Sequence, residues 1–491
     1  MRPFDLPRNA ILTIRNMLCR TRRKGLECVV LPIRGGYPER TVWREPLPFP
    51  FSRLPIFPRE VSLEDMQAIV KMLGNDRRVQ NVVLRFDTLQ ADAAALFSLR
   101  RQFANLRAQG KRLVAWLPGS DTWDYYLASA CDEIILPPSA RLSALGLRAE
   151  VVFLKDVLAL AGIEADLEAI AEYKTSPETF VRSTMSEPHR EMLNSILDSY
   201  FDEIVAAIAQ GRRLEPARVR ALIDRMPLLP AEAVEAGLAD AVLYEDELAT
   251  HLGGLGNPPY NLCTWQDASR WLRQPVAWTT RQVIGVVSLE GIIVSGRSRR
   301  VPLPVPLPIV EAQAGAETLV QTLRQAAADP RIAAVILYID SPGGVAVASD
   351  VIGREVRCLR ERKPVVALLG GQAASGGYYV AVQASRIVAR PTTLTGSIGI
   401  WGGKVVLAGL YRKLGVGREA VQRGAMAAFY SEMAPFSEDE RARLRCDMGE
   451  HYTRFKRLVA EGRGMSEERV EEIARGRVWT GAQAREIGLV D

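Results

Sequence analysis

The sequence contains very little histidine. Its 491 residues include only His189, His251 and His451, and none of them lies in a glycine-rich segment or at the end of an apolar strand. Each is expected to be a surface residue. The Gly-x-Ser-x-Gly turn of α/β-hydrolases is also missing around Ser375, because Ala373 occupies the position of its first glycine. A Ser-His-Asp triad is therefore not expected.

Motifs for metals, cofactors and membrane spans are missing as well. The six cysteines are scattered without the short spacings of a zinc site, and they indicate no disulfide framework. There is no phosphate-binding loop or dinucleotide fingerprint. We therefore predict no cofactor and no metal. An apolar run of about 20 residues is also lacking, so neither a transmembrane segment nor the apolar part of a signal peptide is predicted.

Ser375 has the sequence context of a nucleophile. It lies in Gly-Gly-Gln-Ala-Ala-Ser-Gly-Gly-Tyr-Tyr (370–379), after an apolar strand predicted at 364–369 and before a helix predicted from Tyr378. A hydroxyl at a strand-to-helix turn lies beside backbone amides at the positive end of the helix dipole. The flanking glycines allow a substrate backbone to come close. The segment predicts a nucleophile whose oxyanion is stabilised by amides.

Two further glycine turns occur in the same half of the chain. A predicted strand from Leu337 ends at Gly343-Gly344, which could offer an amide to an oxyanion, and Thr-Gly-Ser-Ile-Gly (395–399) carries the hydroxyl of Ser397. Each turn alone would be interpreted as an ordinary loop, because glycine pairs after strands are common. Together with Ser375, in this order, they favour a single site.

Lys174 is the candidate general base. It lies in Glu-Tyr-Lys-Thr-Ser-Pro (172–177), after the apolar Ala-Ile-Ala. Lysine accepts a proton only when it is neutral, and burial in apolar surroundings can lower its pKa by several units from about 10.4. From its local context alone, Lys174 would be interpreted as an ordinary surface lysine.

These four motifs together resemble signal peptide peptidase A, the long form of the S49 serine protease family. The resemblance extends from about Leu26 to Asp491. It implies that Ser375 is the nucleophile and that Lys174, 201 positions earlier in the other half of the chain, is the general base. It also implies a Clp-protease/crotonase-like α/β fold and a bowl-shaped homo-oligomer, a tetramer. Relatives usually continue for another helix beyond the final Gly-Leu-Val-Asp.

An internal repeat supports one composite site. Tyr125 and the residues after it correspond to Tyr378 and its successors, and the segment ending at Asp240 corresponds to the one ending at Asp491. Thr122 stands where the second copy has Ser375, without flanking glycines. The region that corresponds to Lys174 in the second copy (422–429) contains no lysine. Because each copy lacks what the other keeps, we expect one active site per pair of copies.

Composition and periodicity predict tandem α/β domains with mostly parallel sheets flanked by helices. Apolar residues make up 48% of the chain, enough for full cores. Continuous β-branched strands, as at 333–339, alternate with helical patterns, as at 316–328 and 348–362. The expected domains are a basic N-terminal helix (1–25), a first repeat (26–250), a linker (251–282) and a second repeat (283–491). Proline-rich loops are expected at 46–58 and 301–308.

The N-terminal region concentrates the positive charge. Residues 1–45 hold ten Arg or Lys and four Asp or Glu, a balance of +6 that equals the net charge of the whole chain. A helix is predicted at 7–24, with Ile11, Ile14 and Leu18 on one face. It could lie on an anionic membrane surface or dock on its own domain or a neighbouring subunit. Nucleic-acid binding is not expected, since the other residues are neutral overall.

The sequence thus predicts an ATP-independent serine endopeptidase with a Ser375–Lys174 dyad. The amides of Gly376 and of the Gly343-Gly344 turn would bind the oxyanion, while Ser397 either orients the amine or is a structural turn residue. The resemblance implies remnant signal peptides or other membrane-derived peptides as substrates, and a peripheral membrane or cytoplasmic location. The alternatives are a crotonase-like acyl-CoA enzyme and a catalytically silent scaffold at the membrane.

Overall fold

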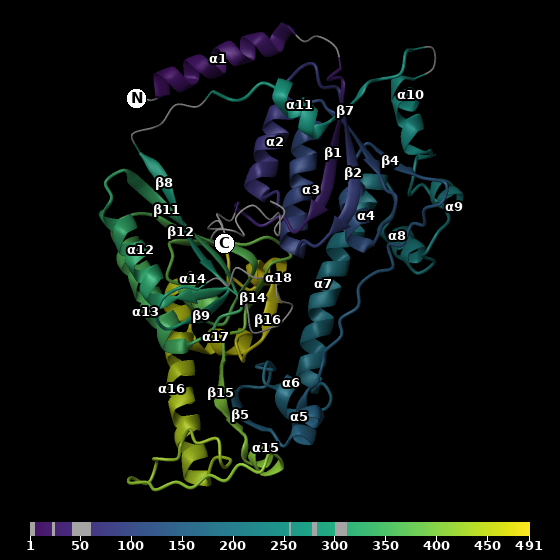
Figure 1. Ribbon diagram of the computed structural model, residues 1–491. Coiled ribbons are helices and arrows are strands. Elements are labelled where there is room, and N and C mark those ends of the chain that lie inside the picture. The colour runs from purple at the N-terminus through teal and green to yellow at the C-terminus, as the bar shows by residue number, and fades with distance from the viewer. Residues whose placement is uncertain (1–4, 22–24, 42–59, 255–256, 277–281, 300–311) are drawn as a thin grey trace. The chain divides into compact units, whose positions relative to one another are not determined.

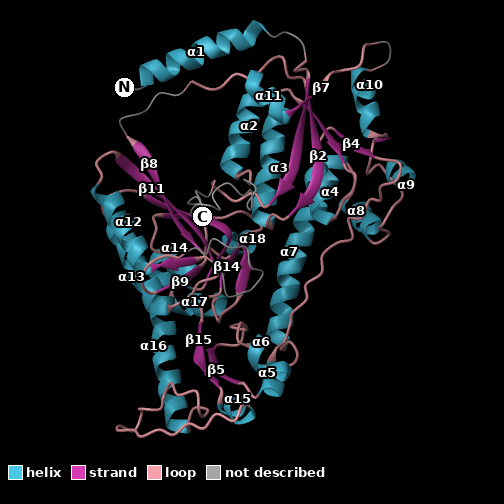
Figure 2. Cartoon of the chain, viewed as in Figure 1, coloured by secondary structure: helices cyan, strands magenta, loops and turns pink. Residues whose placement is uncertain are grey.

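The chain folds into two compact α/β units. The computed structural model describes residues 5–21, 25–41, 60–254, 257–276, 282–299 and 312–491 (Figures 1 and 2). One unit comprises Met1–Leu147 and Tyr200–Arg281, and the other comprises Arg148–Ser199 and Gln282–Asp491. Each contains a largely parallel sheet with helices, as the sequence predicts.

The first unit is built on a sheet in which every neighbouring pair of strands is parallel. Buried apolar runs such as Val82–Leu84 supply its central strands, as expected when helices cover both faces. In spatial order the strands are β6 (Ala241–Val242), β4 (Glu133–Leu136), β3 (Arg112–Trp116), β2 (Asn81–Leu89), β1 (Cys28–Gly35) and β7 (Leu262–Thr264).

The first unit also contains helices that precede, connect and follow these strands. They are α1 (Asp5–Thr21), α2 (Leu63–Asn75), α3 (Ala93–Ala108), α4 (Thr122–Ala128), α8 (Pro216–Ile223), α9 (Pro230–Glu235), the short 3-10 helix Glu245–Glu247, α10 (Leu248–Gly253) and α11 (Trp265–Trp271). The long helix α7 (Glu187–Arg212) runs through residues of both units.

The second unit has a similar sheet with an antiparallel edge strand. In spatial order its strands are β16 (Val478–Thr480), β14 (Leu394–Gly396), β12 (Val365–Ala374), β11 (Ile332–Ser341) and β8 (Val283–Glu290), and β13 (Arg386–Val388) also pairs with β12. Only the β14–β16 pair of this sheet is antiparallel. The smaller pairs are β9 (Ile292–Val294) with β10 (Gln313–Gly315), and β5 (Glu164–Ile170) with β15 (Ile400–Val406).

Helices of the second unit follow the predicted periodicity closely. Helix α12 spans Ala316–Ala328 and α13 spans Ala346–Arg360, within two residues of the predicted ends. The others are α5 (Lys155–Ala161), α6 (Glu178–Val181), α14 (Gly376–Ala381), α15 (Ala408–Lys413), α16 (Glu438–Arg463), α17 (Glu467–Ile473) and α18 (Gly481–Glu486).

The internal repeat is visible as matching hydrogen bonds inside the two units. The buried Tyr125 hydroxyl donates to the Leu238 carbonyl at 2.7 Å, and the buried Tyr378 hydroxyl donates to the Leu489 carbonyl at the same distance. The other matched interactions join Arg212 to Asp240 and Arg463 to Asp491, and the Ile134 amide to Asp240 and the Ile387 amide to Asp491. In each copy, the segment at the C-terminal end is therefore held to the rest of the copy by the same set of hydrogen bonds.

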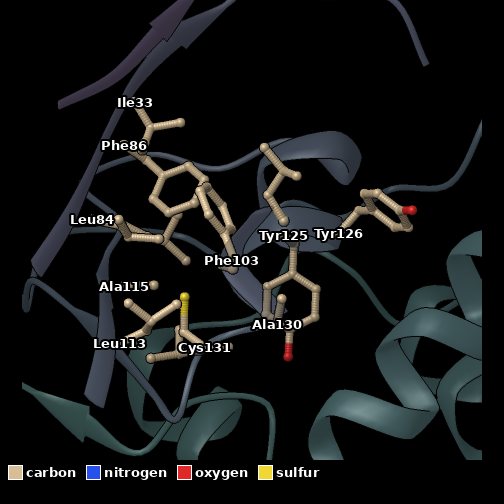
Figure 3. Close-up of a cluster of buried hydrophobic side chains, with 14 of the residues drawn as sticks. Ile33, Leu84, Phe86, Phe103, Leu113, Ala115, Tyr125, Tyr126, Ala130 and Cys131 are labelled. Carbon is tan, nitrogen blue, oxygen red and sulfur yellow. The ribbon is translucent and has the colours of Figure 1, made fainter. Parts of the chain in front are cut away.

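Each unit has its own hydrophobic core. Figure 3 shows part of the first, where Ile33, Leu84 and Phe86 of the sheet lie with Phe103 of α3 and Tyr125 of α4. These side chains are at most 2% exposed. Burial on this scale stabilises a domain by roughly 2 kcal/mol for each large apolar side chain before chain entropy is subtracted.

The unit boundaries differ from the predicted repeats in two places. Residues 148–199, expected in the first repeat, pack in the second unit because β5 forms an antiparallel ladder with β15. The predicted linker 251–282 contains β7, which pairs with β1, and α11. Glycine and proline dominate part of that segment, and its three-residue strand is too short to show a periodicity.

The predicted N-terminal helix is present as α1, and residues 22–24 lie outside the described part. The proline-rich loops predicted at 46–58 and 301–308 also lie outside the described residues. Within the described ranges, no helix combines the length and apolar character needed to cross a membrane.

Candidate active site

The three glycine turns singled out in the second half of the sequence lie together at the carboxyl ends of neighbouring strands in the second sheet. Strands β11, β12 and β14 run parallel, with Ser341 opposite Ala373 and Ala373 opposite Thr395. Their carboxyl ends therefore lie side by side, and the Ser375 amide donates to the Gly396 carbonyl at 2.9 Å. This register brings the turns after all three strands together.

Ser375 occupies the predicted strand-to-helix turn, between the end of β12 and the first residue of α14. Its φ of 53° and ψ of −119° lie in a region that non-glycine residues rarely adopt. Such strain costs roughly 1–3 kcal/mol and persists at functional sites where the surroundings impose it. Gly343 leaves room for the Ser375 side chain, since a Cβ there would lie 2.8 Å from the Ser375 Cβ.

Lys174 reaches the same place from the segment between β5 and α6. Its Nζ lies 3.0 Å from the Ser375 Oγ, although 201 positions separate the two residues. Both belong to the second compact unit. The sequence-predicted pair is thus in hydrogen-bonding distance within one chain.

The surroundings of Lys174 favour a neutral amine. The residue is only 5% exposed, and burial lowers the pKa of Lys174 to about 7. Nζ lies 2.8 Å from the Ser397 Oγ and 3.1 Å from the Ser397 carbonyl oxygen. Among the described residues, no carboxylate forms an ion pair with it, so nothing offsets the loss of water around the charge.

A turn near the C-terminus fixes the backbone of Lys174. The Tyr173 amide donates to the Arg475 carbonyl at 3.0 Å, and the Gly476 amide donates to the Ile398 carbonyl at 2.8 Å. Gly476 has a φ of +81°, and a Cβ there would lie 2.5 Å from the Lys174 amide nitrogen. Only glycine fits between Lys174 and the Ser397 turn at this position.

Sequence analysis missed Gly476. The signal in the sequence is a glycine after helix α17, which predicts a turn but not its contact with a lysine some 300 positions earlier. Three more non-glycine residues near this site have positive φ values, which such residues rarely adopt. They are Ala171, Ser397 and Arg475, with φ values of 73°, 50° and 49°.

Ion pairs attach the Lys174 segment to the second half of the chain. Asp166 of β5 is buried and accepts from Arg441 of α16 at 2.8 Å, while Glu168 accepts from Arg445 at 3.0 Å and also contacts Arg441. Burial raises the pKa of Glu168, but the hydrogen bonds and charges of Arg445 and Arg441 outweigh it and hold that pKa below its usual value. Together with the β5–β15 ladder, the contacts hold the segment that carries Lys174.

Two backbone amides near Ser375 have no acceptor among the described residues. They belong to Gly344 and Gly376, and a Cβ on Gly376 would lie 3.2 Å from the Gly344 nitrogen, so the two are neighbours. The Gly343 amide differs, because it donates to the Ser341 Oγ at 3.1 Å. The oxyanion role of all three glycines stays a prediction, and Gly343 lies against Ser375, since a Cβ on Gly343 would be 2.8 Å from the Ser375 Cβ.

The histidines and the first copy offer no second dyad within the described residues. His189 is buried, contrary to expectation, with its Nδ1 2.9 Å from a Glu178 carboxylate oxygen. His251 contacts Glu133. In the first copy, the Thr122 hydroxyl donates to the Gly146 carbonyl at 2.8 Å and accepts from its amide, so its hydrogen-bonding capacity is already used.

No metal site accompanies this arrangement in the described ranges, where no three His, Cys, Asp or Glu side chains are grouped so that they could hold an ion. In the second copy, the segment that corresponds to the Lys174 region of the first copy is 422–429, and most of its residues are exposed. The chemistry available here consists of a strained serine, a buried amine and two free amides.

The chain is similar in sequence to known peptidases. The profile of Peptidase family S49 matches residues 105–255 and 357–491. The chain is 33% identical over 418 residues to the chloroplastic serine protease SPPA of Arabidopsis thaliana, covering 85% of this chain and 61% of the relative. The second matched stretch lies within the predicted second repeat, and the first lies within the predicted first repeat except for residues 251–255.

Bacterial relatives align over a similar length. Protease 4 of Haemophilus influenzae is 28% identical over 449 residues, covering 88% of this chain and 71% of the relative. Protease 4 of Salmonella typhi is 28% identical over 448 residues, covering 88% and 70%. With a profile that matches more than half of its residues, the chain belongs to peptidase family S49.

Proposed function

We propose that the protein is a serine endopeptidase in which Lys174 is the general base for Ser375. The single observation that carries this proposal is the 3.0 Å separation of the Lys174 Nζ and the Ser375 Oγ. An amine with a pKa of about 7 is half neutral at that pH and largely neutral above it. Its lone pair can then accept the Ser375 proton.

The remaining bonds of the amine suit this role. A neutral amine has two hydrogens, and the Ser397 Oγ and carbonyl oxygen lie at 2.8 and 3.1 Å to accept them. The lone pair is left directed at Ser375. In this proposal Ser397 orients the base and does not react.

The proposed reaction proceeds through an acyl-enzyme. The Ser375 Oγ forms a bond to the peptide carbonyl carbon as its proton passes to Lys174, and the Gly344 and Gly376 amides stabilise the oxyanion. The C–N bond then breaks, and the protonated Lys174 gives its proton to the leaving amine. Water attacks the ester carbonyl carbon and loses a proton to Lys174. The bond between that carbon and the Ser375 Oγ then breaks, Lys174 returns the proton to the Oγ, and the acid leaves.

Peptides freed in or near membranes are the proposed substrates. A relative in Enterococcus faecium, 35% identical over 170 residues, bears the name putative signal peptide peptidase SppA. An S49 oligomer, as the sequence resemblance implies, remains a prediction that size-exclusion chromatography can test.

The test is hydrolysis of unfolded casein and of a peptide ester. Ser375→Ala and Lys174→Ala should each lower kcat by at least about 10³-fold, with melting temperatures close to that of the unaltered protein. Lys404→Ala is the matched control, because Lys404 is also a buried lysine of the second unit but binds the Phe429 carbonyl. Full activity in Lys174→Ala would refute the dyad.

Labelling separates this function from a crotonase-like one. A fluorophosphonate should modify Ser375 in the unaltered protein and should fail to modify Ser375→Ala. An acyl-CoA enzyme needs no serine nucleophile, so the absence of labelling together with the absence of peptide hydrolysis would reject the protease.

A further inference from the structure

Arg477 contacts two segments that surround the proposed base. Its carbonyl oxygen accepts a hydrogen bond from the Ser397 amide at 2.7 Å, and the Ser397 Oγ lies 2.8 Å from the Lys174 Nζ. Its guanidinium carbon lies 5.0 Å from the ring centre of Tyr173, the residue before Lys174. One residue therefore connects the segment that carries the amine to the turn that carries Ser397.

The Arg477 side chain belongs to a closed set of contacts. One of its terminal nitrogens donates to a Glu191 carboxylate oxygen at 2.7 Å, and the Tyr173 hydroxyl donates to the other oxygen at 2.7 Å. The hydrogen bonds from Tyr173 and Arg477 lower the pKa of Glu191, so this carboxylate is charged at neutral pH. The guanidinium also lies over the Trp479 ring, 4.6 Å from its centre. We refer to Tyr173, Glu191 and Arg477 as the arginine triangle.

Arginine suits this position because its guanidinium is planar. It can stack on an aromatic ring and donate hydrogen bonds in its own plane at the same time. The Arg477 side chain is only 18% exposed, so solvent screens these contacts little. A lysine would keep the charge but lose the flat surface that packs on Tyr173 and Trp479.

The place of the Lys174 amine depends on how the backbone around it is held. A flexible four-carbon stem separates the Cα of a lysine from its Nζ, so a shift of the backbone can move the amine away from the Ser375 Oγ. The hydrogen bond from the Tyr173 amide to the Arg475 carbonyl fixes the main chain at one point. The ring and hydroxyl of Tyr173 add a second point of attachment, which limits rotation of the segment about the first.

We propose that Arg477 is a positioning residue for peptide hydrolysis. It holds the Lys174 segment through the arginine triangle and the Ser397 turn through its carbonyl, so that the Lys174 Nζ stays within hydrogen-bonding distance of the Ser375 Oγ. Arg477 acts through these neighbours and does not itself react. This inference rests on the proposed function, because it requires Lys174 to be the base.

The test compares Arg477→Met with the matched control Arg418→Met. Arg418 makes the same kind of contacts in the same unit, since its guanidinium lies 5.0 Å from the Tyr411 ring centre and both residues contact Glu432. In the sequence, the seven residues of β15 separate this second set from the Ser397 turn. Arg477→Met should lower kcat on a peptide ester by about 10²-fold and change KM by less than about threefold. Arg418→Met should change each by less than about twofold.

Two further variants separate geometry from charge and from folding. Arg477→Lys should stay within about threefold of Arg477→Met in kcat, because charge alone does not replace the stacked plane, and full recovery would overturn the inference. Tyr173→Phe keeps the ring and deletes the hydroxyl, and it should lower kcat about tenfold with an unchanged melting temperature. If Arg477→Met does not fold, an unchanged kcat in Tyr173→Phe overturns the inference.

A Lys174→Ala background shows whether Arg477 acts through the base. In that background, Arg477→Met should cause no further loss in the rate at which a fluorophosphonate labels Ser375. An equal loss in both backgrounds, or a kcat of Arg477→Met within about twofold of the unaltered protein, would overturn the inference. Failure of the proposed function would look different, because Lys174→Ala alone would then be fully active.

Discussion

Gly476→Ala tests whether the placement of Lys174 controls catalysis. A Cβ at this position would lie 2.5 Å from the Lys174 nitrogen and 2.6 Å from its Cα, where ordinary contacts begin at 3.4 Å. Gly476 also donates to the Ile398 carbonyl, so its own turn is fixed. The Lys174 backbone must therefore move by about 1 Å, and a displacement of this size can cost about 10²-fold in rate.

The control separates this contact from backbone strain. Gly464, at the end of α16, has a φ of +64° and nothing within 4 Å of a Cβ. Gly464→Ala should share the destabilisation of roughly 1 kcal/mol that a left-handed alanine causes, without touching Lys174. The difference in kcat between the two variants then measures the effect of the displaced amine.

The assay is the pH dependence of kcat on a peptide ester, together with thermal melting. If the displacement of the Lys174 backbone admits water to the amine, the apparent pKa of Lys174 should rise from about 7 toward the reference of about 10.4. Activity should then partly return at alkaline pH, where the amine loses its proton. A purely structural defect would not shift the profile in this way. Equal kcat and equal pH profiles for Gly476→Ala and Gly464→Ala would refute the reasoning.

Three further predictions concern the surroundings of the dyad. Ser397→Ala removes one acceptor of the amine and should lower kcat about tenfold with little change in KM, whereas an unchanged kcat would show a purely structural serine. Gly344→Ala, whose Cβ would lie 2.1 Å from the Ile293 carbonyl oxygen, should displace an oxyanion amide and lower kcat by about 10²–10³-fold. Arg441→Met leaves the buried Asp166 carboxylate without its ion-pair partner and should lower the free energy of unfolding by about 1–3 kcal/mol in urea titrations, unlike Arg469→Met at an exposed pair.

Local sequence patterns predicted the second half of the site well. The strand-turn-helix around Ser375, and the turns at Gly344 and Ser397, follow from apolar runs that end in glycine, and parallel strands necessarily bring their carboxyl ends to one edge. The pattern could not distinguish Gly343 from Gly344, because the two differ only in whether the amide meets the Ser341 hydroxyl.

Local sequence patterns did not predict contacts between residues that are far apart in the sequence. Lys174 was identified through family resemblance, since its burial depends on a turn near Gly476 and on β5 pairing with β15. The same pairing moved residues 148–199 into the second unit, against the predicted repeat boundary. His189 was expected at the surface, yet its partner Glu178 lies in a neighbouring helix and allows burial. The periodicity of apolar residues predicts which face of a helix or strand is buried, but it does not predict which distant residue a side chain will contact.

The most direct measurement is the rate at which a fluorophosphonate modifies Ser375 as a function of pH, in the unaltered protein and in Lys174→Met. With a neutral Lys174 as the base, the rate should rise as pH increases through about 7, following loss of the amine proton. In Lys174→Met the rate should fall by orders of magnitude and lose this inflection. Labelling of Lys174→Met at the unaltered rate, with the same inflection near pH 7, would contradict the account.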